Sequence, residues 1–139
     1  MLALCFNRLP ASFREHALGT GLGAGIGGAA LFALGLWLAV LARMSLGENW
    51  GMPMTEKERP ELVTTGIYGY VRHPIYIGML LMMLGSAWVV NAYWLLVFVV
   101  AAGYFVVSAV VEEHNLERQF GKPYERYRRK TKMFVPFVA

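Results

Sequence analysis

The chain has 139 residues, of which 57% are hydrophobic and 16% are charged, and its formal net charge is +4. Soluble domains are about 45–50% apolar and about 25% charged, and a small soluble protein needs more polar groups than this chain has to cover its surface. The composition therefore excludes an ordinary soluble domain, and the length predicts one integral membrane domain, 1–139, rather than two domains.

The first apolar stretch spans residues 17–42, carries no charge and exceeds the about 20 residues that cross a bilayer. It is rich in glycine between Gly19 and Gly28, and small residues spaced by four let helix backbones pack closely in lipid. We therefore expect this face, including Gly23 and Gly27, to pack against another helix. The same letters match a dinucleotide-binding fingerprint, but that motif follows a strand and none is evident here.

A polar segment follows at 43–73 and contains the breakers Gly51, Pro53 and Pro60. We expect it to form a loop on the membrane surface.

Residues 74–111 are apolar apart from Asn91, which predicts a helical hairpin that turns there. Pro74 suits the first turn of a helix, where its missing N–H costs nothing. The first arm has about 17 residues, the lower limit for a span, so a buried hairpin of a soluble protein is the alternative. The second arm is expected to continue past Glu112 and to end before Gly121 as its cap.

Residues 112–139 form a basic tail, and six of the thirteen lysines and arginines lie in its last eighteen residues. Beside membrane spans, such a tail indicates anionic lipid headgroups rather than nucleic acid as the partner. The positive-inside rule places it in the cytoplasm, with the loop at 43–73 on the same side and the N-terminus outside, in an inner or plasma membrane. The tail's aromatic residues suit a headgroup-level belt: Tyr124, Tyr127, Phe134 and Phe137.

The hairpin brings together two polar clusters, Arg72-His73 before its first arm and Glu112-Glu113 at the end of its second. Ionisable groups at the edge of a span are costly unless they pair or serve a site. A purely structural ion pair is one interpretation, and a functional site is the other. The three histidines lack the spacing of metal ligands, and no nucleophile has a plausible base beside it, so we expect neither a metal nor a catalytic nucleophile.

Several spaced motifs resemble the isoprenylcysteine carboxyl methyltransferase family, a branch of the membrane methyltransferases that includes phospholipid methyltransferases. They begin with Leu46-Gly47-x-Asn49-Trp50 and continue with Glu61-Leu62-Val63-Thr64-Thr65-Gly66-x-Tyr68-x-x-x-Arg72-His73-Pro74-x-Tyr76-x-Gly78. They end with Glu112-Glu113-x-x-Leu116-x-x-x-Phe120-Gly121-x-x-Tyr124-x-x-Tyr127 and Pro136. Together these blocks cover about two thirds of the chain in the right order.

The resemblance implies an all-α membrane protein of about three spans that transfers a methyl group from S-adenosylmethionine to a lipophilic or prenylated acceptor. The acceptor it implies first is an isoprenylcysteine-type carboxylate, which is already anionic at pH 7 and needs no general base. Substrate contacts are implied for Arg72 and Glu113. The implied cofactor-binding residues are Glu61, Leu62, Val63, Tyr68, His73, Pro74, Ile75, Tyr76 and Glu112.

Three departures from the family pattern affect the choice of acceptor. Pro60 stands where members often have histidine, Ser108 where prenylcysteine methyltransferases can carry an arginine, and Met133 where an arginine is frequent. The alternatives are therefore methylation of a phospholipid amine or a small lipophilic thiol, a non-catalytic membrane scaffold that retains the fold, and a membrane reductase with a related layout.

Overall fold

The structure is a computed structural model that describes residues 21–49, 61–90 and 93–134. Within these ranges the fold is all-α, as the sequence predicted. Residues 17–20 of the predicted first span, and Phe137 of the predicted belt, lie outside the described residues. The elements are α3 (Leu22–Leu46), the 3-10 helices η1 (Gly47–Asn49) and η2 (Gly66–Gly69), α4 (Pro74–Val90), α5 (Tyr93–Phe120) and α6 (Lys122–Lys130).

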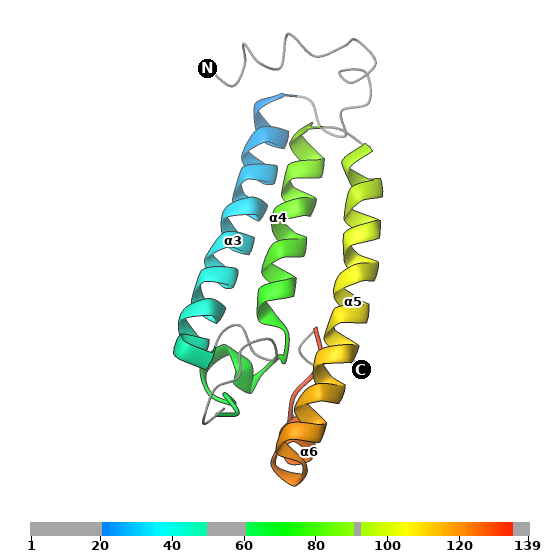
Figure 1. The fold of residues 1–139 in the computed structure, drawn as a ribbon. Helices are drawn as coiled ribbons and strands as arrows, with labels where there is room; N and C mark the ends of the chain where they lie inside the picture. Colours follow the sequence, from blue (N-terminus) through cyan, green and yellow to red (C-terminus); the bar gives the residue numbers. More distant parts are fainter. Residues whose placement is uncertain (1–20, 50–60, 91–92, 135–139) are drawn as a thin grey trace.

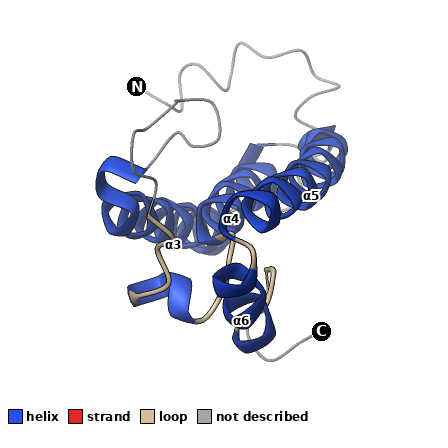
Figure 2. Cartoon of the chain, turned by 60° about the horizontal axis from the view of Figure 1, so that its bottom comes forward, coloured by secondary structure: helices blue, strands red, loops and turns tan. Residues whose placement is uncertain are grey.

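The three long helices lie side by side in a row, with α4 between α3 and α5 (Figure 1). The contact between α3 and α4 is much more extensive than the contact between α4 and α5. Beneath the row, η2, the loop that follows it and α6 gather at one end (Figure 2). This end holds the predicted site.

Two of the helices are long and apolar enough to cross a membrane, α3 with 25 residues and α5 with 28. At 1.5 Å per residue they measure roughly 38 and 42 Å, against a hydrocarbon thickness of about 30 Å. The third helix, α4, is shorter, with 17 residues. Only 11% and 6% of the apolar windows of α3 and α5 are buried in the protein, so their exposed apolar side chains suit lipid rather than water.

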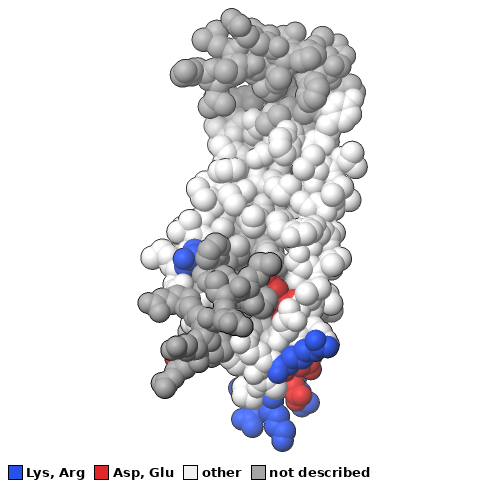
Figure 3. Space-filling view, in the orientation of Figure 1, with Lys and Arg blue, Asp and Glu red and all other residues white. Residues whose placement is uncertain are grey.

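Charged side chains are confined to one end of the described protein (Figure 3). The described surface in the middle of this view is uncharged, and the lower end carries both basic and acidic groups. This distribution is the one expected of helices whose ends emerge from a bilayer.

Helix α3 packs against α4 along a seam of small residues spaced by seven. A Cβ atom built on Gly35 would lie 2.5 Å from the carbonyl oxygen of Gly78, and one on Gly28 would lie 2.8 Å from that of Gly85. The backbones therefore touch, and no larger side chain fits at these positions. The predicted glycine face was wrong in part, because no described residue of another helix or loop lies within 4 Å of a Cβ atom built on Gly23 or Gly27.

The outer ends of the hairpin lie at Pro74 and Phe120. Pro74 begins α4, and α5 continues two turns beyond Glu112 to Phe120. Gly121 follows with a φ of +57°, a left-handed conformation that glycine adopts without strain. This turn reverses the chain and lets α6 pack against the end of α5.

The predicted aromatic belt was wrong for Tyr124 and Tyr127. Both lie on the same face of α6, as their spacing predicted, but Tyr124 is completely buried and Tyr127 is 8% exposed. Their rings meet edge to face with centroids 6.0 Å apart, inside the protein rather than among lipid headgroups. The reason is that α6 turns back beneath the helix row, so its apolar face has protein to pack against.

After α6 the chain runs alongside the segment that leads into α4. Lys132 donates from its backbone to the Tyr70 carbonyl and accepts from the Arg72 N–H, while His73 donates to the Met133 carbonyl. These backbone bonds are 2.9–3.3 Å long. We call residues 131–134 the C-terminal strap, and it fixes the chain on one side of His73.

Candidate functional site

The two polar clusters predicted from the sequence meet at the common end of α4 and α5. The Nε atom of Arg72 donates to Oε1 of Glu113 over 2.6 Å, although the two residues are 41 positions apart in the chain. Their side chains are only 10% and 7% exposed. The hairpin thus brings the clusters into direct contact, as predicted.

Arg72 also holds the chain that follows α6. Its Nη1 donates to the backbone carbonyls of Arg128 and Thr131. One guanidinium therefore joins the entry of α4, the end of α5 and the start of the strap. Since Arg72 and Glu113 satisfy each other, the geometry accounts for both without a substrate.

His73 lies between the two carboxylates and is 7% exposed. Its Nδ1 is 3.4 Å from Glu112 Oε2, and its Nε2 is 3.4 Å from Glu113 Oε1. Burial alone would lower the pKa of His73, but the two carboxylates outweigh it and raise the pKa above its usual value. Within the described part of the chain, the Nε2 atom nevertheless lacks a partner with hydrogen-bond geometry.

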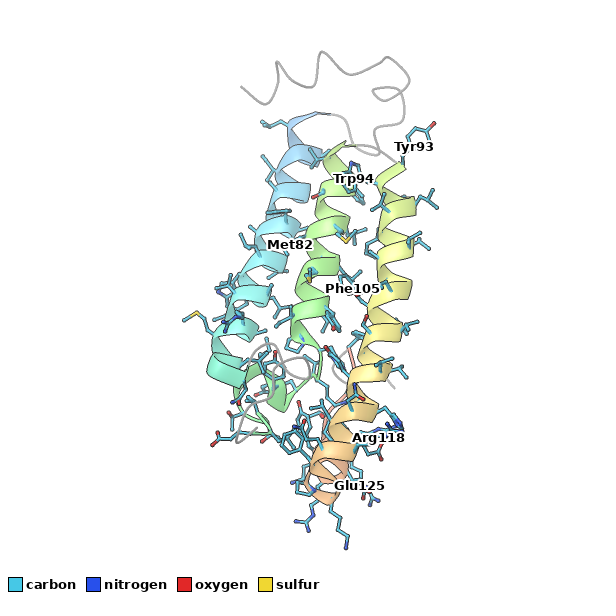
Figure 4. All side chains as sticks on the ribbon, in the orientation of Figure 1. Met82, Tyr93, Trp94, Phe105, Arg118 and Glu125 are labelled. Carbon is cyan, nitrogen blue, oxygen red and sulfur yellow. The ribbon has the colours of Figure 1, made fainter. Side chains whose placement is uncertain are left out.

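A chain of aromatic rings connects His73 to the facing helix. The rings of His73 and Tyr76 are stacked with an interplanar angle of 4°, and Tyr76 stacks on Phe105 with centroids 4.9 Å apart. Phe105 lies on the side of α5 that faces α4 (Figure 4). The Tyr76 hydroxyl donates to Glu112 Oε1 over 2.8 Å. Glu112 keeps a side chain that is 34% exposed, so it remains accessible to a ligand.

A pocket of about 80 Å³ opens on the other side of His73. Its walls combine the segment before η2, the ends of α3 and α5, and the buried face of α6. The lining residues are Leu46, Glu61, Leu62, Val63, Tyr68, Arg72, His73, Leu116, Tyr124 and Tyr127.

The tyrosines around the pocket remain protonated at neutral pH. Burial raises the pKa of Tyr127 to about 12, and burial raises the pKa of Tyr68 and Tyr124 above their usual values. The Tyr127 hydroxyl donates to the Tyr68 carbonyl over 2.8 Å. By contrast, the Tyr124 hydroxyl has no hydrogen-bond partner among the residues that the structure describes.

Most of the residues predicted for the cofactor fall into two adjoining groups with His73 between them. Residues 61–63 and Tyr68 line the pocket, while Tyr76 and Glu112 pair on the opposite side. Pro74 is fully buried at the start of α4, and Ile75 is half-buried beside it.

Sequence reasoning missed part of this site. It did not assign Leu46, Leu116, Tyr124 or Tyr127 to the pocket. The signal that was available is the spacing of Tyr124 and Tyr127, which made one face of a helix apolar but did not reveal what that face contacts. Phe105, in the middle of an apolar helix, carried no signal at all.

Comparisons with known proteins identify similar sequences and a similar fold. The model of the phospholipid methyltransferase family matches residues 24–123. A protein-S-isoprenylcysteine O-methyltransferase of Schizosaccharomyces pombe is 33% identical over 109 residues, which cover 76% of this chain and 46% of the relative. A methanethiol S-methyltransferase of Crocosphaera subtropica is 35% identical over 120 residues, covering 78% of this chain and 46% of the relative.

A solved structure shares the fold. The eukaryotic intramembrane Ras methyltransferase (isoprenylcysteine carboxyl methyltransferase) aligns with a TM-score of 0.73 and 24% identity, over 82% of this chain and 42% of that one. The chain thus spans about half the length of the curated relatives that it matches.

Proposed function

The chain belongs to the phospholipid methyltransferase family, and we propose that it transfers the methyl group of S-adenosylmethionine to a lipophilic acceptor at the membrane surface. The observation that carries this proposal is the contact of Tyr76 with Glu112 beside the stacked ring of His73. It places an accessible carboxylate and aromatic faces together at the edge of the predicted spans.

The residues present fit this cofactor. S-adenosylmethionine carries its methyl group on a sulfonium cation and also has ribose hydroxyls, an ammonium and a carboxylate. Aromatic faces such as those of Tyr76 and Phe105 attract such cations, and Glu112 can accept hydrogen bonds from hydroxyls or an ammonium. The pocket beyond His73 adds an apolar wall from Leu62, Val63 and neighbouring leucines.

The site favours acceptors that arrive already ionised. A carboxylate is fully anionic at pH 7. A thiol with a pKa near 8.5 is ionised only in small part, but it loses its proton far more readily than an ammonium group does. A phospholipid amine must first lose a proton. Glu113 is occupied by Arg72, which leaves Glu112 as the candidate base for that case. We therefore propose an isoprenylcysteine-type carboxylate as the acceptor.

A second acceptor class is favoured by one specific observation. The half-buried Ser108 takes the place of the substrate-binding arginine of prenylcysteine methyltransferases. Arg72 does not replace that arginine, because its side chain is 10% exposed and already bonded. Without an arginine to bind the carboxylate of a prenylcysteine, an uncharged lipophilic thiol becomes the second candidate acceptor. A relative of this chain is named for methylating methanethiol.

The experiment that tests the function compares acceptors directly. Purified protein in lipid nanodiscs is incubated with methyl-labelled S-adenosylmethionine and, in turn, a farnesylcysteine analogue, an alkyl thiol and phosphatidylethanolamine. We expect label in the first or the second and none in the third. Absence of transfer to all three, together with no binding of the cofactor, would leave the scaffold as the better description; binding of a nicotinamide nucleotide instead would indicate the reductase.

A further inference from the structure

Two buried polar atoms without hydrogen-bond partners lie on one pocket. Among the side chains that the structure describes, only His73 Nε2 and Tyr124 Oη are buried and lack such a partner. Both residues line the same 80 Å³ pocket. Leaving a buried polar group unpaired costs about 1–3 kcal/mol, so native proteins seldom retain one without a reason.

We propose that Tyr124 and His73 form a subsite that binds a carboxylate group of a ligand. The pocket of about 80 Å³ has room for a group of a few heavy atoms. A carboxylate matches this size and accepts several hydrogen bonds. The proposal rests on the proposed methyltransferase function only for the identity of the ligands.

The protonation states of both groups suit an acceptor ligand. The buried Tyr124 phenol stays protonated at neutral pH and can only donate to an anion, because its own pKa is raised by burial. His73 lies between two carboxylates that favour its charged form, in which Nε2 carries a proton. The subsite thus offers two donors.

The electrostatics of the pocket permit an anion despite the nearby glutamate. Glu113 is 3.4 Å from His73 Nε2, but its charge is matched by Arg72 at 2.6 Å. Arg72 itself lines the pocket. A bound carboxylate therefore meets His73 and the Tyr124 hydroxyl, and charge-assisted hydrogen bonds of this kind are stronger than neutral ones.

Tyr127 supplies an internal comparison. It lies three residues from Tyr124 on the same face of α6 and lines the same pocket, but its hydroxyl is already bonded to the Tyr68 carbonyl. The Tyr127 hydroxyl thus has a structural role, while that of Tyr124 has none within the described protein. Removing the hydroxyl at each position in turn therefore distinguishes an effect on ligand binding from an effect on packing.

Two ligands of the proposed reaction contain a carboxylate, namely the amino-acid part of the cofactor and the cysteine end of a prenylated acceptor. Calorimetry on the full chain in nanodiscs distinguishes them. One pair of probes is S-adenosylhomocysteine and its decarboxylated analogue, and the other is N-acetyl-S-farnesylcysteine and its amide. We expect wild type to bind the carboxylate form of one pair about tenfold to a hundredfold more tightly than its partner.

The variant Tyr124→Phe then tests whether the Tyr124 hydroxyl contacts the carboxylate of the ligand. It keeps the ring, so we expect the thermal midpoint to be unchanged or higher, while the preference for the carboxylate form is lost. Tyr127→Phe is the matched control and should keep that preference.

Equal affinities within both pairs for wild type would overturn the subsite without requiring any variant, and the pocket would then hold only water. A preference that survives in Tyr124→Phe would also overturn it. Failure of wild type to bind either S-adenosylmethionine or S-adenosylhomocysteine is a different result, because it removes the proposed function; the farnesylcysteine pair still tests the subsite in that case.

Discussion

Arg72 and Glu113 form a buried ion pair with 2.6 Å between Nε and Oε1, and the same guanidinium bonds the carbonyls of Arg128 and Thr131. One side chain thereby holds three segments that are distant in sequence. The resemblance to known methyltransferases had suggested a substrate contact for this pair, whereas its burial indicates a structural role.

The first prediction concerns this pair. Arg72→Met should lower the free energy of unfolding by about 3–5 kcal/mol, because it leaves Glu113 buried without its partner. Arg128→Gln is the control, because the Arg128 side chain is 51% exposed and lies 3.8 Å from the same carboxylate, farther than Arg72 does. This substitution should lower the free energy of unfolding by at most about 1 kcal/mol. Denaturant titration in detergent measures both. Equal stabilities of the two variants would contradict the structural role.

The second prediction concerns the accessible carboxylate. Glu112→Gln should fold normally but bind S-adenosylhomocysteine about tenfold to a hundredfold more weakly, because charge-assisted hydrogen bonds contribute roughly 1.5–3 kcal/mol each. Glu117→Gln, on the same helix and outside the site, should bind like wild type. Calorimetry on folded variants makes the comparison. Unchanged affinity of Glu112→Gln would move the cofactor site elsewhere in the chain.

The third prediction distinguishes glycines inside the α3–α4 seam from those outside it. Gly35→Ala should lower stability by about 1–3 kcal/mol, because the new methyl would overlap the Gly78 carbonyl and the Met82 N–H. Gly27→Ala meets open space and should be neutral, or stabilising by up to about 1 kcal/mol, because alanine favours helix. Thermal midpoints in detergent test the pair, and a larger loss for Gly27→Ala would place the seam on the other face of α3.

The fourth prediction concerns pH. The folded pKa of His73 is raised above its usual 6.5, so the charged form of His73 stabilises the folded state. That contribution is fully present below pH 6.5 and is lost as pH rises through the folded pKa. The thermal midpoint of wild type should therefore fall between pH 6 and pH 9 by more than that of His73→Gln. Parallel curves for the two proteins would show that His73 does not contribute.

The fifth prediction concerns orientation. The basic end of the protein should face the cytoplasm, since lysine and arginine are retained there by the positive-inside rule. Ala139→Cys in a Cys5→Ser background should resist an impermeant thiol reagent in intact cells and react after lysis. Cys5 alone, in the natural chain, should show the opposite behaviour. Labelling of residue 139 in intact cells would contradict the predicted orientation and indicate the opposite one.

Some of the structure was predictable because local chemistry determines it. Pro74 marks the start of the hairpin, and a hairpin must bring Arg72 close to Glu113 whatever the packing around it. The end of α5 was equally clear, because a glycine follows Phe120 and a proline soon after it.

Other features required knowledge of tertiary packing. The sequence contains more glycines in α3 than the seam uses, and only the position of α4 selects Gly28 and Gly35 from among them. The seven-residue spacing shared with Gly78 and Gly85 was the available signal. Likewise, an apolar face with Tyr124 and Tyr127 suits lipid or protein equally well until the turn at Gly121 directs it inward.

The seam between α3 and α4 also has a consequence for biosynthesis. Because translation runs from the N-terminus, α3 leaves the ribosome before α4, and during that interval its seam glycines have no α4 to contact. The polar segment between the helices is long enough to leave α4 free to approach from any direction. Insertion of α3 and docking of α4 are therefore separate events. Gly28 and Gly35 form a contact surface only when α4 docks.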